Sequence, residues 1–524
     1  MAGGDGEQHR RSESDGVERE EEDSRAMEVR NSSGRMGGKN GEGEAGDGGG
    51  NSVLAEVKMQ FQLAWPIVAA NVLSFSVAVM SVMFVGHLGE VELSSASLAN
   101  SFAVISGFSF MIGLGTGLET LCGQAYGAKR YHLMGVYLQC AIIVTNLTLI
   151  PILLLWFNME KILLVVGQDP QISKNGASYL RYVAPSLFSY AFSQPLIKFL
   201  QTQSIVMPIM LCSLVSAVLH PFICYTYIYL LDFGFIGGAL ATSTSYVFLV
   251  ILLLSYTIFS GRCGQCWGGF AIRDALGSVK LYLNLAVPSV VMICFEWWSF
   301  ELLALSSGLL SKPSLELSLL TVSLNTVNFT DMIPLGLCVA ASIRVSNELG
   351  ANRPDKAKLA VKVALSLAVL DGCIVFVALI LSRHFWGHAF TNVEEVLDYV
   401  AEVTPFLACL TFMDAVQYVG SGVIRGCGRQ AIGAGINLTA YYIIGIPTCL
   451  FLAFWLHLNG KGLVMGLVFA ISVQTTLVLS VVSCTNWRRM ADRALDRIAQ
   501  AAHATSLHEP LLPSHSKRPQ ERLS

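Results

Sequence analysis

Residues 63–66, Leu-Ala-Trp-Pro, open the first long apolar run of the chain, and residues 285–288, Leu-Ala-Val-Pro, recur in the seventh run, 222 positions later. Further matches keep the same order at offsets of 220 to 228 residues, among them 127–130, Gly-Ala-Lys-Arg, and 350–353, Gly-Ala-Asn-Arg. Chance matches would not stay in register over six apolar runs. The sequence therefore predicts two related halves.

Composition assigns these halves to a membrane. Hydrophobic residues make up 53% of the chain, charged residues 14%, and the mean hydropathy is +0.55, whereas charged residues alone reach roughly a quarter of a soluble domain. A helix needs roughly 20 apolar residues to cross a bilayer. We expect an all-α membrane protein with twelve transmembrane helices, at 63–86, 98–118, 133–156, 177–200, 208–230, 236–259, 281–305, 318–342, 357–382, 399–424, 433–456 and 463–484.

Charge in the loops orients these helices. Lys and Arg collect after even-numbered runs, and the loops after odd-numbered runs are poorer in them. The positive-inside rule then places both termini in the cytoplasm. Because each half has an even number of runs, both halves enter from the same side and are related by an axis along the membrane normal. Transporters built in this way bind substrate between the halves, near mid-bilayer.

The same pattern divides the chain into five parts. The first 50 residues are rich in Gly, Ser, Glu and Arg and cannot bury enough apolar surface to offset the cost of ordering. We expect a disordered cytoplasmic tail at 1–50, an N-lobe at 51–260, a cytoplasmic inter-lobe loop at 261–280, a C-lobe at 281–487 and a cytoplasmic C-terminal tail at 488–524.

Carboxyl groups inside the predicted helices are few. A charge at the bilayer centre costs roughly 2.5 to 3.5 kcal/mol on insertion scales, so each one needs a reason. Glu296 and Glu301 lie in the seventh run, about 140° apart around the helix, and Asp414 lies midway along the tenth, where it can meet Glu296 if the helices adjoin. Asp331 is a secondary acidic candidate. For each group, a hydrogen bond that only links helices is the alternative role.

A desolvated carboxyl group disfavours its charged form and can exchange protons. If an organic cation and a proton compete for one carboxylate, a proton that enters from one side displaces the cation to that side. This competition is the minimum requirement for antiport. The predicted proton-coupling residues are therefore Glu296, Glu301 and Asp414, all in the second half. The matching positions of the first half hold Ser74, Val79 and Gln194.

Other side chains are predicted to shape the cavity. Trp297 and Trp298 can attract a cation through their rings, worth roughly 0.5 to 2 kcal/mol, and packing against lipid or helices is the alternative for each. Asn325 and Asn328 can line a polar cavity or only bond between helices. The remaining cavity candidates are Gln194 and Gln417, and the hinge candidates are Pro66 and Pro288.

Charged and thiol groups elsewhere receive structural interpretations. Glu119, Lys198 and Arg344 lie near predicted cytoplasmic helix ends, where we expect them to snorkel or to anchor loops. Cys263 and Cys266 form a C-x-x-C pair, but a second pair at metal-binding spacing is missing. We therefore predict no metal site and no cofactor, with a proton gradient as the energy source.

Four ordered motifs carry a family resemblance: 123–128, Gly-Gln-Ala-Tyr-Gly-Ala; 296–301, Glu-Trp-Trp-Ser-Phe-Glu; 344–350, Arg-Val-Ser-Asn-Glu-Leu-Gly; and 425–428, Arg-Gly-Cys-Gly. From about residue 55 to 487 the chain resembles the multidrug and toxic compound extrusion (MATE, or DETOXIFICATION) transporters, especially their plant branch.

The resemblance implies two six-helix lobes in a V shape, alternating access and proton-coupled efflux of organic cations, xenobiotics or plant secondary metabolites. In relatives, acids of the second lobe carry protons, and these match Glu296, Glu301 and Asp414. Asp331 departs from the family pattern, in which an aromatic residue is usual.

Two other functions stay open from the sequence: a membrane-embedded transferase, although paired acidic metal motifs are missing, and a lipid-linked sugar flippase, although the core is poor in Arg and Lys. We expect a monomer whose partners are the lipid bilayer, a small organic substrate and protons, without nucleic acid. Residues 509–512, Glu-Pro-Leu-Leu, resemble a sorting signal and favour the vacuolar membrane slightly over the plasma membrane.

Overall fold

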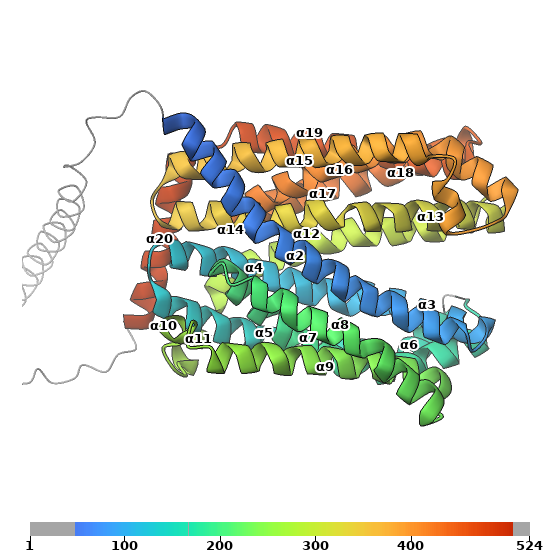
Figure 1. Cartoon of the computed structure of the whole chain (residues 1–524), viewed down its shortest axis with the longest axis horizontal. Coiled ribbons are helices and arrows are strands. Elements are labelled where there is room, and N and C mark those ends of the chain that lie inside the picture. The colour runs from blue at the N-terminus through green and yellow to red at the C-terminus, as the bar shows by residue number, and fades with distance from the viewer. Residues whose placement is uncertain (1–47, 166, 507–524) are drawn as a thin grey trace, which may run out of the picture. The chain divides into compact units, whose positions relative to one another are not determined.

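The computed structural model describes residues 48–165 and 167–506, and every regular element in that part of the chain is a helix (Figure 1). Among these described residues, those from Glu56 onward form one compact unit. Eleven helical spans are long and apolar enough to cross a membrane. The fourth predicted span, a less apolar helix of 33 residues, supplies the twelfth. The prediction of an all-α membrane protein with twelve such helices is confirmed.

Six long helical segments form the N-lobe. Its elements are α2 (Gly48–Gly86), α3 (Glu90–Ala103), the π-helical turn η1 (Val104–Phe108), α4 (Ser109–Gly127), α5 (Tyr131–Phe157), α6 (Met159–Val165), α7 (Pro170–Thr202), α8 (Met207–Tyr225), η2 (Thr226–Leu230) and α9 (Gly234–Phe259). Two short helices, α10 (Gly264–Trp267) and α11 (Ile272–Gly277), occupy the predicted inter-lobe loop.

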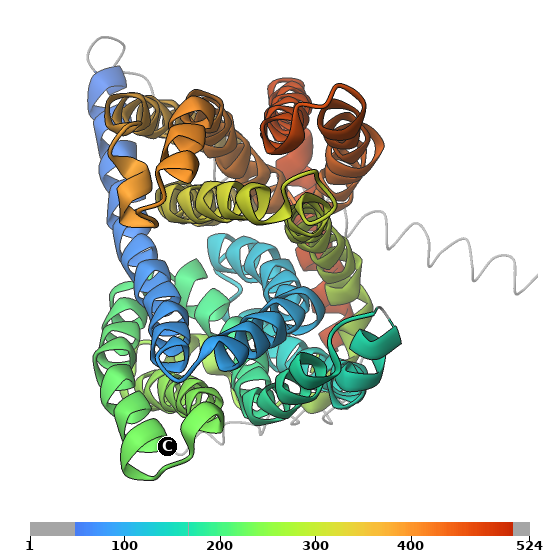
Figure 2. The ribbon, with the colours of Figure 1, turned by 90° about the vertical axis from the view of Figure 1, so that its right-hand side faces the viewer.

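Six further segments form the C-lobe, and one helix follows them. These elements are α12 (Val279–Ser307), α13 (Pro313–Thr330), α14 (Met332–Gly350), α15 (Pro354–Ser382), η3 (Trp386–Ala389), α16 (Glu394–Gly426), α17 (Gln430–Asn437), η4 (Leu438–Gly445), α18 (Ile446–Leu450), η5 (Phe451–Trp455), α19 (Asn459–Ser483) and α20 (Trp487–Ser506). Figure 2 shows the C-lobe helices, yellow to red, grouped apart from the cyan-to-green helices of the N-lobe.

The internal repeat is visible in the local backbone. The turn after α4 places Lys129 at a φ of 59°, and the turn after α14 places Asn352 at a φ of 55°. In each turn the next residue, Arg130 or Arg353, donates its N–H to a carbonyl five positions earlier, which satisfies a carbonyl left free at the helix end. Two turns with the same unusual conformation, 223 residues apart, are what a duplicated half leaves behind.

The two halves also contact each other reciprocally. A Cβ atom added to Gly127 would overlap the carbonyl of Asn347, and one added to Gly350 would overlap the carbonyl of Gln124. The repeat relates Gly127 to Gly350 and Gln124 to Asn347, so each contact corresponds to the other. Residues correspond in this way across a two-fold interface. The pseudo-two-fold relation between the lobes therefore passes between α4 and α14, at their predicted cytoplasmic ends.

One helix of each half packs against the opposite half. Along α12, Ala286 and Val290 contact Gly117 and Gly113 of α4, where added Cβ atoms would lie 2.6 and 2.5 Å from the α12 Cα atoms. The first half repeats this arrangement, because Gly336 of α14 leaves no room for a Cβ beside α2. In Figure 1, α2 crosses obliquely from the C-lobe helices towards α3.

Helix α20 joins the two lobes on one side of the bundle. Its first half buries Met490, Ala491 and Ala494 in a C-lobe core, and its second half buries Ile498 and Ala501 in an N-lobe core. Figure 1 shows it lying across the ends of both lobes. Residues 488–506 of the predicted C-terminal tail are therefore helical, and the part up to Ala501 packs against both lobes.

The Arg497 side chain of α20 closes the end of α16. Its guanidinium group donates to the carbonyls of Cys427 at 3.2 Å and Gly428 at 3.3 Å. Burial lowers the pKa of this guanidinium from its ordinary value. Gly428 has a φ of 71°, and its missing side chain makes room for Arg497.

Three sequence expectations have different outcomes in the structure. The predicted eighth helix at 318–342 is broken: α13 ends at Thr330 and α14 starts at Met332. Cys263 and Cys266 are buried free thiols. Residues 1–47 and 507–524, which hold most of the predicted N-terminal tail and the sorting motif, lie outside the described residues.

Candidate functional site

Glu296 lies at the centre of a buried polar cluster in the C-lobe. Its side chain on α12 is buried, and Asn437 of α17 donates its Nδ2 hydrogens to Glu296 Oε2 at 3.3 Å and to the Met292 carbonyl at 2.8 Å. Gln474 of α19 donates to Asn437 Oδ1 at 2.9 Å. Three helices thus hold one carboxyl group in a fixed position.

The packing of α12 explains why Glu296 faces this cluster. Cys294 and Trp298 continue the α12 stripe onto α4 and the turn η1 that precedes it. Cys294 Sγ lies 3.6 Å from Ser109 Oγ of α4, and Trp298 Nε1 donates to the Ile105 carbonyl of η1 at 3.0 Å. Glu296 is two residues from each of them, which is about 200° around a helix. It therefore faces the C-lobe when the stripe contacts the N-lobe.

Asp414 and Asp331 complete a group of three carboxyl groups. Asp414 on α16 is 1% exposed and Asp331, between α13 and α14, is 8% exposed. Their carboxyl groups lie within hydrogen-bonding reach of each other, and both interact electrostatically with Glu296. The carboxyl groups of Glu296 and Asp414 are thus close enough to interact electrostatically. Asp331 lies with them, although the sequence ranked it as a secondary candidate.

These acids have few fixed donors. Three of their oxygens accept no hydrogen bond from an N–H or hydroxyl group of a described residue: Asp414 Oδ1, Asp414 Oδ2 and Asp331 Oδ1. Buried polar atoms are normally paired, and two adjacent buried carboxylates repel each other. The arrangement therefore calls for protons or a cation at the carboxyl oxygens.

A cation at one end of α16 partly balances the acids. Arg425 is buried, and it interacts electrostatically with both Glu296 and Glu119. Its carbonyl accepts a hydrogen bond from Thr120 Oγ1 of α4 at 2.8 Å. Arg425 thus lies where the acid cluster of the C-lobe approaches the N-lobe.

The other predicted site residues are dispersed. Glu301 is half-buried on α12, and no described residue bonds to its carboxyl group. Trp298 contacts the N-lobe backbone, as given above, and Gln417 is buried and donates to Ser421 Oγ at 3.2 Å. Trp297 and Gln194 are half-buried, whereas Asn325 and Asn328 are exposed.

The hinge candidates Pro66 and Pro288 occupy corresponding places in α2 and α12. Pro288 lies between Ala286 and Val290, the two residues that contact α4. Pro66 lies between Ala64 and Val68, which lie against Gly336 of α14. Each proline is thus at the point where its helix crosses the opposite half.

Glu119 and Lys198 do not snorkel but pair inside the N-lobe. Lys198 Nζ of α7 lies 2.7 Å from Glu119 Oε2 of α4, with 8% and 1% of their side chains exposed. The expectation that these residues reach towards water or anchor loops is wrong, because each supplies the opposite charge that allows the other to be buried.

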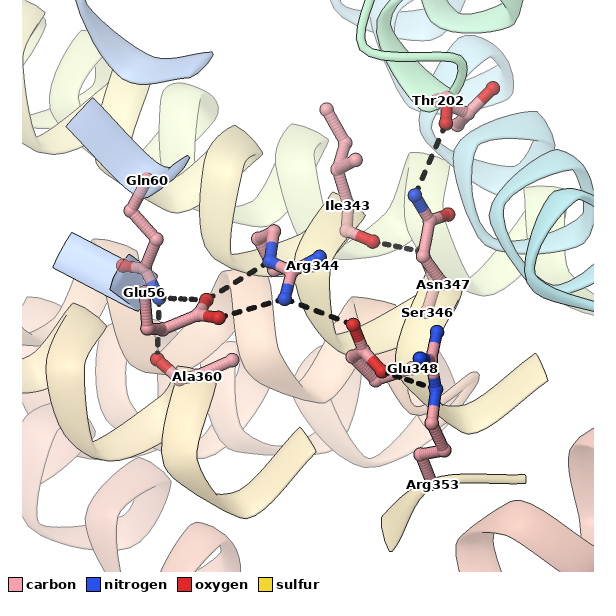
Figure 3. A network of polar contacts seen from close by, with 10 residues as sticks. All are labelled: Glu56, Gln60, Thr202, Ile343, Arg344, Ser346, Asn347, Glu348, Arg353 and Ala360. Carbon is pink, nitrogen blue, oxygen red and sulfur yellow. Dashed lines mark hydrogen bonds and ion pairs between the residues drawn. The ribbon is translucent and has the colours of Figure 1, made fainter. Parts of the chain in front are cut away.

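Arg344 anchors α2 to α14 (Figure 3). Its guanidinium group contacts Glu56 of α2 at 2.7 Å and Glu348 of α14 at 2.9 Å, and Arg353 extends the network to Glu348 at 2.9 Å. Nearby, Asn347 Nδ2 donates to the Thr202 carbonyl of α7 at 3.3 Å. This network links elements of both halves at the predicted cytoplasmic end.

Sequence reasoning missed Asn437 and Gln474 as parts of the site. Both residues lie in long apolar runs of the sequence. A buried amide in a predicted transmembrane helix is the signal that could have identified both, because polar groups there are expensive.

Comparison with known proteins identifies similar chains. The MatE family model matches residues 66–226 and 288–451, one stretch in each half. Protein DETOXIFICATION 16 of Arabidopsis thaliana is 46% identical over 452 residues, which cover 86% of this chain and 93% of the relative. Protein DETOXIFICATION 17 of the same plant is 45% identical, covering 86% and 94% of the two chains.

Solved structures of MATE transporters have a similar fold. The crystal structure of the eukaryotic MATE transporter AtDTX14 matches with a TM-score of 0.82 and 39% identity, covering 85% of this chain and 100% of that one. The Vibrio cholerae MATE transporter VcmN in its bent form matches with a TM-score of 0.71 at 14% identity, covering 87% and 99%, which is a likeness of fold alone.

Proposed function

Because the chain belongs to the MATE family of multidrug and toxic compound transporters, we propose that it is a proton-coupled antiporter that moves organic solutes by alternating access. Membership of this family makes the chain a membrane transporter and not an enzyme. The observation that carries the proposal is the buried cluster of Glu296, Asp414 and Asp331, in which both oxygens of Asp414 and Oδ1 of Asp331 have no hydrogen-bond donor among the described residues.

The acids would couple proton and solute by competition. A carboxylate of Glu296 or Asp414 attracts an organic cation, and protonation from the aqueous phase removes that attraction. The bond from Asn437 orients the Glu296 carboxyl group in both states. Proton entry on one side then releases the solute on the same side, and proton loss on the other side restores the site. Trp297, Asn325, Asn328, Gln194 and Gln417 are the proposed contributors to the solute cavity.

Alternating access requires the lobes to separate at the end where they now touch. The contacts of Gly127 with Asn347 and of Gly350 with Gln124 close the predicted cytoplasmic end, and the Arg344 network reinforces it. Pro66 and Pro288, which lie where α2 and α12 cross the opposite half, are the proposed hinges. A kinked helix bends at its proline because one backbone hydrogen bond is missing there.

The proposed setting is the vacuolar or the plasma membrane, with the protein as a monomer and both termini in the cytoplasm. Basic residues along α20 support this orientation, since Arg488, Arg489 and Arg493 follow the last span, and cytoplasmic flanks are enriched in Lys and Arg. The solutes would be organic cations, xenobiotics or plant secondary metabolites.

The test is transport by purified protein in proteoliposomes with an imposed pH gradient. We expect the gradient to drive efflux of ethidium, a monovalent organic cation, and alkaloids, flavonoids, citrate and hormones form the wider screen. Glu296→Gln and Asp414→Asn should each lower coupled transport at least tenfold. Glu301→Gln should lower it less, because Glu301 lies outside the cluster.

The matched control is Glu402→Gln, which changes an acid on the same helix as Asp414 but at an exposed ion pair with Lys461. It should behave as the unmodified protein does. Solute transport that persists in Glu296→Gln after the pH gradient has been collapsed would refute proton coupling.

A further inference from the structure

Asp331 occupies a break in the middle of the eighth membrane segment. Its N–H donates to the Val327 carbonyl at 2.9 Å, and its carbonyl accepts from Leu335 at 2.9 Å. Pro334 has no N–H to donate to the carbonyl of Thr330, four positions earlier, which helps to explain why α13 ends there. The backbone of Asp331 is thus satisfied on both sides of the break, and its side chain is free to point inward.

The Asp331 side chain points at Asp414. The two carboxyl groups are within hydrogen-bonding reach, and both side chains are more than nine-tenths buried. Of their four oxygens, three accept no hydrogen bond from a described N–H or hydroxyl group. Two carboxylates can bond to each other only if one of them has a proton, and like charges this close cannot both ionise without a counter-ion.

The surroundings favour a shared proton. The groups that interact electrostatically with the pair are Glu296 on α12, Asp371 on α15, Tyr418 on α16 and Tyr441 on η4. None of these four groups is a cation, and the buried Arg425 of α16 interacts with Glu296. A second negative charge on the pair would therefore lack a local partner.

We propose that Asp331 and Asp414 hold one proton between them, and that this proton is exchanged in each transport cycle in addition to the one bound by Glu296. The inference rests on the proposed antiport. A proton from the aqueous phase forms an O–H bond with one carboxylate oxygen of the pair, and the neighbouring carboxylate accepts a hydrogen bond from it. Release to the other side leaves two carboxylates, which the arriving organic cation neutralises in part.

The consequence is electrical. Exchange of one monovalent cation for one proton moves no net charge across the membrane. Exchange of one such cation for two protons moves one net positive charge in the direction in which the protons move. The unmodified protein should therefore be electrogenic, and Asp331→Asn should be electroneutral, with its ratio of protons to cations reduced from two to one. Asp331→Glu, which restores a carboxyl group, should restore the ratio of two.

The experiment uses ethidium-loaded proteoliposomes without a pH gradient and with a membrane potential set by potassium and valinomycin. An inside-negative potential should drive ethidium out in the unmodified protein and in Asp398→Asn, an exposed acid on the same helix as Asp414. It should not do so in Asp331→Asn, which should still respond to a pH gradient. Equal responses to the potential in Asp331→Asn and the unmodified protein would overturn the proposal.

A second measurement needs neither substrate nor transport. The infrared C=O band of a protonated carboxyl group should be lost in Asp331→Asn and also in Asp414→Asn, because one shared proton produces it. Loss of two different bands would overturn the proposal. If the unmodified protein shows no response to a pH gradient, the antiport itself fails. If it responds but is electroneutral, only the role of Asp331 fails.

Discussion

Arg344 of α14 binds the Glu56 carboxylate of α2 at two points, through Nε at 3.0 Å and through Nη2 at 2.7 Å. The side chains are only 12% and 4% exposed. Paired, bidentate contacts of this kind are stronger than single ones. Since α2 belongs to the first half and α14 to the second, this ion pair ties the halves together at the predicted cytoplasmic end.

A double-mutant cycle measures the strength of this tie. We expect Glu56→Gln and Arg344→Gln to show a coupling free energy of about 1–3 kcal/mol in thermal unfolding, as contacting residues in one ion-pair network do. Lys312 and Glu395 lie 2.9 Å apart with both side chains exposed, and the same cycle there should give no measurable coupling. Equal coupling at the two pairs would contradict the role of burial.

The contact between α4 and α14 is predicted to be intolerant of a single methyl group. Gly350→Ala places a Cβ on the Gln124 carbonyl, and relief requires the two helices to separate. Overpacking of this kind costs about 1–3 kcal/mol. Amide hydrogen exchange at 124–127 and 347–350 should accelerate in Gly350→Ala. Gly435→Ala is the control, because nothing lies within 4 Å of an added Cβ there.

The buried pair of Glu119 and Lys198 predicts an asymmetric pattern of stability. Lys198→Met removes the cation that contacts the Glu119 carboxylate, and loss of one member of a buried ion pair should cost about 3–5 kcal/mol. The double variant Glu119→Gln with Lys198→Met removes both charges and should recover most of that loss. Thermal unfolding in detergent measures both. If the double variant is no more stable than Lys198→Met, the loss does not arise from an unpaired charge.

Arg497 is predicted to hold α20 in place. Arg497→Ala removes two hydrogen bonds to the end of α16 and should lower the unfolding free energy by about 1–3 kcal/mol. Protease sensitivity within 487–506 should rise at the same time. Arg493→Ala alters an exposed arginine of the same helix and should change neither measurement. A similar rise in both variants would show that the bonds are not responsible.

The thiols of the C-x-x-C pair are predicted to react slowly. Burial, with a smaller contribution from Cys263, raises the pKa of Cys266 to about 11. The thiolate is the reactive form, so at pH 7 only a minor fraction is available. Maleimide labelling of Cys266 should accelerate about tenfold per pH unit until the pH approaches that pKa. Labelling that does not change with pH would contradict this assignment.

Much of the architecture is predictable from sequence because apolar runs and loop charges act locally. The repeat was readable from pairs such as Pro66 and Pro288, and the structure gives those prolines equivalent surroundings. An interaction between Glu296 and Asp414 is also predictable, since a buried acid requires a partner and the number of acids is small.

The rest depends on contacts between distant segments. Nothing in the local pattern of Lys198 indicates that Glu119 lies beside it, 79 positions away, so a snorkelling interpretation was natural. The position of Asp331 in the cluster is not predictable, because the break between α13 and α14 lies inside a continuous apolar run. Asn437 and Gln474 are ordinary polar residues until three helices bring them to one carboxyl group.

The packing of α20 against both lobes affects the turnover rate expected of the transporter. If the lobes part at this end, Met490 and Ile498 cannot both keep their places, so one half of the helix must detach. The free energy of that detachment adds to the barrier between the two orientations of the site. Turnover would then be limited in part by side chains that lie after the last membrane span and outside the acid cluster.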